Sequence, residues 1–144
     1  MKYWCDGSAV WTHFANAASI IFPAWEKAFA AVGNHYLDKV TDQKLKARLQ
    51  KFIDEELAHA SAHDSYNKRY NLSEAEIYEY KRTRAIYRKI HWKYWLGTMV
   101  SIEHLASCFS RCMVDRWGHK EGREFKLFVW HAREELGHKL SLIH

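Results

Sequence analysis

The chain has 144 residues, a formal net charge of +5, and 48% hydrophobic and 27% charged residues. This composition excludes a disordered chain, and the length suits one domain, residues 1–144, whose core needs no disulfide. No apolar run reaches membrane-spanning length and no signal peptide is recognisable, so we expect a cytoplasmic protein without membrane partners. The modest positive charge is interspersed with acids and aromatics. It argues against nucleic acid and leaves anionic small molecules as partners.

A single proline and six glycines favour long helices with few turns. The first predicted helix covers Ser8–Asp38. Pro23 is expected to kink or break it, because proline lacks the backbone donor and clashes with the preceding turn. The second predicted helix has Thr41 or Asp42 as its N-cap and runs to about Tyr70.

Three further helices follow. Ser73 and Glu76 have the spacing of a capping box, which predicts a helix over Glu74–His91. This helix either crosses the bundle or forms the first part of a longer helix. The next helix is predicted over Trp92–Trp117, and the last begins near Gly122 and continues almost to the end of the chain. The sequence therefore predicts an all-α four-helix bundle with an additional crossover helix.

Steps of three and four residues reveal the inward face of each core helix, and these faces are apolar at the ends but ionisable in the middle. Buried carboxylates are costly unless a positive charge compensates them, and two metal ions would supply that charge. One Glu from each of two helices and Glu-x-x-His from each of the other two is the ferritin-like dinuclear pattern. Carboxylates with imidazole suit iron, with manganese or a mixed Mn/Fe pair as alternatives. The predicted ligands are Glu26, Glu56, His59, Glu103, Glu135 and His138.

Several further side chains accompany these ligands. His131 lies four residues before Glu135 on the same face and is predicted as a seventh ligand. His63 and Asn67 continue the face of His59 as a further ligand or as outer-shell groups. His104 follows Glu103 and must point about 100° away from it around the helix, so it is expected in the outer shell. The adjacent carboxylates Glu55 and Glu134 are assigned to the solvent side or the outer shell.

Nearly the whole chain resembles the bacterial "predicted metal-dependent hydrolase" family. The resemblance lies in Phe14–Ser19, Phe22–Glu26, Phe52–His59 with His63 and Asn67, Ile102–His104, and Trp130–Lys139. It implies a ferritin-like fold, and the family's name implies hydrolysis. The His-x-x-x-Glu-x-x-His spacing also resembles the ligands of dinuclear arylamine N-oxygenases, in which an added histidine binds one iron. Family members typically continue further, and the short C-terminus suggests a minimal version that forms a homodimer.

Three functions compete at this point. The favoured one is an O2-activating oxidoreductase or oxygenase, with two irons as cofactors and O2 and a small molecule as partners. The alternative is a dimetal-dependent hydrolase of an anionic ester or phosphate, which the basic surface would attract. The third is a non-enzymatic metal-binding protein.

Overall fold

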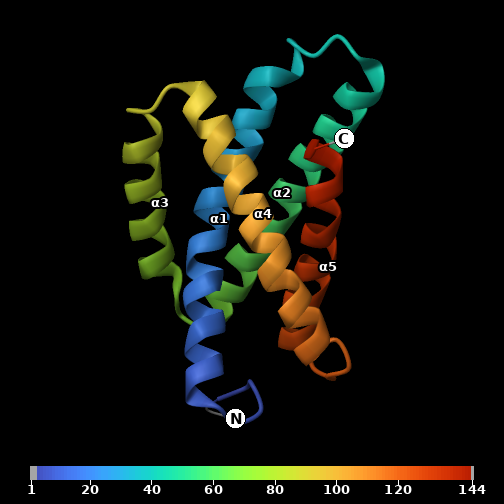
Figure 1. The fold of residues 1–144 in the computed structure, drawn as a ribbon. Coiled ribbons are helices and arrows are strands. Elements are labelled where there is room, and N and C mark those ends of the chain that lie inside the picture. Colours follow the sequence, from blue (N-terminus) through green and yellow to red (C-terminus); the bar gives the residue numbers. More distant parts are fainter. Residues whose placement is uncertain (1–2, 144) are drawn as a thin grey trace. The chain divides into compact units, whose positions relative to one another are not determined.

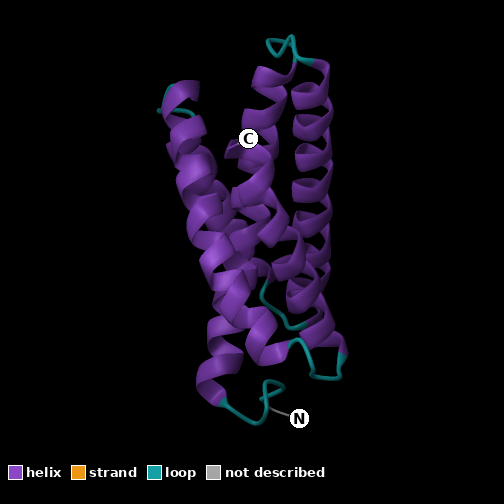
Figure 2. Cartoon of the chain, turned by 45° about the vertical axis from the view of Figure 1, so that its right-hand side comes forward, coloured by secondary structure: helices purple, strands orange, loops and turns teal. Residues whose placement is uncertain are grey.

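The computed structural model describes residues 3–143, with side chains as far as His138. Its five helices are α1 (Ala9–Leu37), α2 (Gln43–Arg69), α3 (Ser73–Tyr87), α4 (Trp92–Trp117) and α5 (Arg123–Ile143). Figure 2 shows helices joined by loops and no strand in the part of the chain that is described. The all-α prediction is confirmed, and the architecture is consistent with a helical bundle. None of the described helices is both long and apolar enough to cross a membrane.

The chain divides into two compact units, the first ending at Trp92 and the second beginning at Lys93. The first unit contains α1, α2 and α3, and Figure 1 shows α1 with α2 on one side and α3 on another. The second unit contains the hairpin of α4 and α5. The prediction of one domain over residues 1–144 stays a prediction.

The first two helices begin close to the predicted residues, and each has a side-chain N-cap. The Ser8 hydroxyl accepts a hydrogen bond from the Trp11 backbone amide, and the Asp42 carboxylate accepts one from the Leu45 amide. Each satisfies a backbone donor that the first helical turn leaves open. Helix α2 ends before Asn71, which has a left-handed φ of 57°, a conformation that asparagine tolerates at helix ends.

Three local expectations differ from the structure. Pro23 was expected to kink or break the first helix, and α1 continues through it without a break. The capping box also does not form, because α3 begins at Ser73 itself, no side chain caps it, and the Glu76 carboxylate accepts a hydrogen bond from Asn67 instead. Helix α3 has 15 residues and ends at Tyr87, short of the predicted His91.

Within the first unit, α1 and α2 approach closely at Gly33. A Cβ atom built on Gly33 would lie 2.7 Å from a side-chain carbon of Ile53. The adjoining core contains the buried side chains of Phe29, Val32 and Phe52. The absence of a side chain at position 33 therefore allows α1 and α2 to pack closely.

Within the second unit, aromatic side chains hold α4 against α5. The Trp117 ring packs edge-on against Phe125 and Phe128, with centroid separations of 5.9 and 6.2 Å. Trp95 and Met99 are also buried along α4. The neighbouring Leu96 is half-buried.

Candidate metal centre

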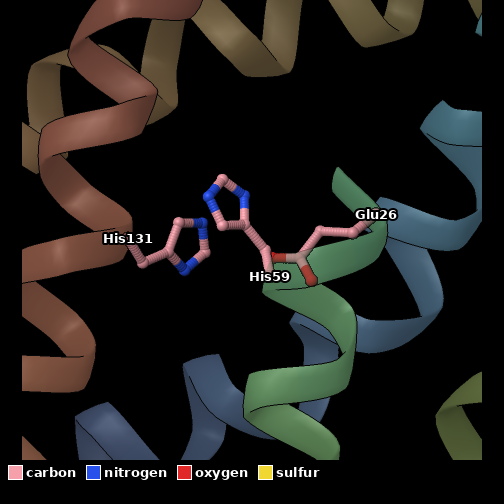
Figure 3. Close-up of side chains that lie close together, drawn as sticks. All are labelled: Glu26, His59 and His131. Carbon is pink, nitrogen blue, oxygen red and sulfur yellow. The ribbon is translucent and has the colours of Figure 1, made fainter. Parts of the chain in front are cut away.

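The first unit carries three buried side chains of the predicted ligand set. Glu26 on α1 is 4% exposed, and Glu56 and His59 on α2 are 1% and 0% exposed. A carboxylate oxygen of Glu26 lies within 4.8 Å of a ring nitrogen of His59, and Figure 3 shows the Glu26 carboxylate beside the His59 side chain. His59 Nδ1 is 3.7 Å from Glu56 Oε1. Helical spacing thus places the Glu-x-x-His pair on the face of α2 that receives the carboxylate from α1.

His63 and Asn67 extend this face by two further turns, and both are fully buried. Each of them contacts Ser19 of α1: His63 Nδ1 lies 2.9 Å from the Ser19 hydroxyl, and Asn67 Oδ1 lies 2.8 Å from it. Phe22 packs edge-on against the His63 ring at a centroid distance of 4.9 Å. The two residues therefore belong to a polar network between α1 and α2, directly adjacent to the Glu-x-x-His pair along α2.

The second unit carries the other four predicted ligands, all buried. His138 Nδ1 of α5 lies 3.0 Å from Glu103 Oε2 of α4 and 3.5 Å from Glu135 Oε2 one turn earlier. His131 Nε2 lies 3.1 Å from Glu135 Oε1, so the His-x-x-x-Glu-x-x-His spacing brings all three side chains together on one face of α5. The His131 ring projects from α5 in Figure 3.

The two carboxylates of the second unit differ in proton affinity. Burial raises the pKa of Glu103 to about 7, against the opposing hydrogen bond from His138. Burial would also raise the pKa of Glu135, but its contacts with His131 and His138 outweigh burial and lower it. One carboxylate is thus ionised between two imidazoles, while the other takes up a proton near neutral pH. A cation is a further way to compensate such charges.

The two units bury the same kinds of side chain. Each provides one Glu from one helix and a Glu-x-x-His pair from the next, with one additional histidine four residues away on the same face. This donor set of carboxylates and imidazoles fits iron, manganese or zinc, which accept oxygen and nitrogen ligands.

Other predicted groups lie away from these buried clusters. The His104 side chain is exposed. Glu134 is half-buried, and Glu55 is half-buried and pairs with Lys51 on the outer side of α2. The assignment of these two glutamates to positions outside the buried set agrees with their location.

Sequence reasoning missed Ser19 and Glu76. Ser19 joins His63 to Asn67, and Glu76 accepts a hydrogen bond from Asn67 across α2 and α3. A signal for Ser19 was present, because Pro23 four residues later cannot donate to its carbonyl oxygen. Pro23 was interpreted only as a cause of a kink or break, although it also leaves the Ser19 carbonyl open to a donor from another helix.

These features define an all-α protein with buried Glu and His groups that can bind metal. A family described as "Predicted metal-dependent hydrolase" matches residues 1–141, and the chain belongs to this family. Neither the curated proteins nor the solved structures give a significant match. Membership confirms the resemblance noted from the motifs.

Proposed function

We propose that the buried Glu and His side chains of this protein bind two metal ions, and that the loaded protein is a hydrolase of an anionic ester or phosphate. The observation that carries this proposal is that each unit buries the same set of Glu and His side chains. Four carboxylates buried in helices require compensation, and the imidazoles spaced three residues from two of them are metal donors. The family description favours hydrolysis over the O2-activating reaction that the sequence favoured.

In this proposal the glutamates provide the oxygen donors and the ExxH histidines the nitrogen donors. The candidate ligands are Glu26, Glu56, His59, Glu103, His131, Glu135 and His138. Two bound cations would polarise the scissile bond and activate water. The chain contributes burial, which strengthens electrostatic interactions at the site, and a net charge of +5, which favours an anionic substrate. A ferritin-like arrangement of the helices is part of the proposal.

The decisive experiment compares metal binding with two reactivities. The purified protein is depleted of metal and reloaded anaerobically with Mn²⁺, Zn²⁺ or Fe²⁺. Bound metal per chain is measured, followed by hydrolysis of a panel of nitrophenyl phosphates and esters. We expect about two ions per chain and hydrolysis that disappears with chelation. Glu56→Gln is the inactive variant, and Glu55→Gln is the matched control one residue away.

The same preparation tests the competing oxidoreductase. The His131–Glu135 contact at 3.1 Å supports an added histidine beside the ExxH pair, which is the feature shared with the arylamine N-oxygenases. If the Fe²⁺ protein develops a visible chromophore with O2 but hydrolyses none of the panel, the oxidoreductase replaces the hydrolase. If no metal binds, both enzymes are excluded.

A further inference from the structure

A polar network in the first unit fixes the orientation of one buried amide. Asn67 Nδ2 donates to the Ser19 backbone carbonyl at 2.8 Å and to Glu76 Oε2 at 2.7 Å. A backbone carbonyl can only accept, so the nitrogen of this amide must be the atom that faces it. The oxygen Oδ1 consequently faces the Ser19 hydroxyl at 2.8 Å. The usual ambiguity between the two ends of an asparagine side chain is therefore removed.

The direction of the next hydrogen bond follows from counting protons. Asn67 Oδ1 carries no hydrogen, so the Ser19 hydroxyl must donate its single proton to it. That hydroxyl can then only accept from its other neighbour, His63 Nδ1, at 2.9 Å. His63 Nδ1 must therefore carry a proton, whether the ring is neutral or charged.

From this network we propose that Ser19 and Asn67 are positioning residues, which hold His63 with its proton on Nδ1 and its lone pair on Nε2. Positions 56, 59 and 63 follow helical steps of three and four, so His63 shares the face of α2 that carries Glu56 and His59. Phe22 restricts the ring from one side. Nε2 is thus the nitrogen that carries the lone pair.

The role of His63 rests on the proposed function. Among the described residues, no group of ligand atoms spaced to hold a metal includes His63. His63 is therefore assigned as an outer histidine beside the Glu-x-x-His pair of α2, and not as a ligand. Groups around the ligands of a metal site commonly hold those ligands in place, and their mutation weakens metal affinity about 10–100-fold.

Nitrogen-15 NMR of the metal-free protein tests the tautomer directly. Histidine-labelled protein is recorded at a pH where the ring is neutral, and the His63 signals are assigned by their loss in His63→Gln. We expect the proton on Nδ1 in the wild type. Ser19→Ala should give mixed tautomers or the Nε2-protonated form, and Ser19→Thr, which keeps a hydroxyl, should restore Nδ1 protonation. An Nε2-protonated wild type overturns the proposal, and so does an unchanged tautomer in a folded Ser19→Ala variant.

A zinc titration followed by the same signals tests the outer role. We expect His59 nitrogen to shift as a ligand while His63 Nε2 does not, and Ser19→Ala to bind Zn²⁺ about 10–100-fold more weakly than the wild type. Direct coordination through His63 Nε2, or unchanged affinity in Ser19→Ala, overturns this role. If the wild type binds no metal, the proposed function fails while the tautomer result from the metal-free protein stands.

Discussion

The side-chain amide of Asn67 donates a 2.8 Å hydrogen bond to the backbone carbonyl oxygen of Ser19, 48 residues earlier in the chain. In an uninterrupted helix this carbonyl would accept from the backbone amide of residue 23, but Pro23 has none. A donor from α2 thus replaces the hydrogen bond that α1 lacks. This accounts for a proline that lies inside a continuous helix and is itself buried.

This compensation predicts that positions 23 and 67 are energetically coupled. In the wild type, Asn67→Ala leaves the Ser19 carbonyl without the Asn67 donor. In Pro23→Ala, a backbone amide is available to replace that donor. We expect Asn67→Ala to cost about 1 kcal/mol less in the Pro23→Ala background than in the wild type, measured by urea denaturation. Asn34→Ala, also on α1, should be additive with Pro23→Ala. Additivity at position 67 as well would show that Asn67 does not replace the missing donor.

Neighbouring glutamates should differ sharply in their effect on metal binding. Glu56 is buried beside His59, whereas Glu55 is half-buried and pairs with Lys51. We expect Glu56→Ala to abolish stoichiometric binding, measured as metal per chain after dialysis, and Glu55→Ala to retain about two ions.

The second unit offers an equivalent comparison. His138→Ala removes a buried imidazole that contacts the carboxylates of Glu103 and Glu135. Glu134→Ala removes a half-buried carboxylate outside that cluster. We expect His138→Ala to lose metal binding and Glu134→Ala to retain it. Equal losses in the two variants would contradict the assignment of inward and outward faces on α5.

The stability of the metal-free protein should depend on the protonation of Glu103. Its pKa is raised to about 7 in the folded protein, above its ordinary value of 4.5, chiefly by burial. Between these values the folded state binds more protons than the unfolded state, so the free energy of unfolding falls as pH rises. The loss from this residue is at most roughly 3 kcal/mol by pH 8.

Glu103→Gln tests this dependence, because the amide cannot ionise. Relative to the variant, the wild type should lose stability between pH 5 and pH 8 in urea denaturation with a chelator present. The lowered pKa of Glu135 acts in the opposite direction. Its contribution to stability changes only at pH values below the ordinary carboxyl range, outside this window. Parallel pH profiles for the two proteins would mean that Glu103 is already ionised at pH 5.

Helix packing in the first unit should be sensitive to a single methyl group. Gly33→Ala would place a Cβ atom 2.7 Å from the Ile53 side chain, and we expect a loss of about 1–3 kcal/mol in stability. Gly97→Ala is the matched control on α4, since among the described residues no atom beyond the chain neighbours and the helix's own backbone lies within 4 Å of its built Cβ. It should stabilise by up to about 1 kcal/mol through helix propensity. A Gly33→Ala variant as stable as Gly97→Ala would show that Ile53 moves aside without cost.

The sequence by itself determined the helices and the composition of the candidate centre. Ser8 and Asp42 begin their helices as expected, and α4 has the predicted bounds. The buried carboxylates and imidazoles were also identified, including His131 and His63. Caps act within one turn, and the side chains on one helical face recur every three or four residues. Both signals are therefore local and can be read without the fold.

The partners of distant donors and acceptors depend on the tertiary structure. Ser73 and Glu76 have the spacing of a capping box, yet Glu76 pairs with Asn67 of another helix. Pro23 removes a donor in any helix, but whether the helix breaks depends on a replacement from elsewhere, here Asn67. The proton on His63 Nδ1 follows from the same network. Hydrogen bonds between helices depend on which side chains the fold brings together, and periodicity along one helix contains no information about the partner on the next.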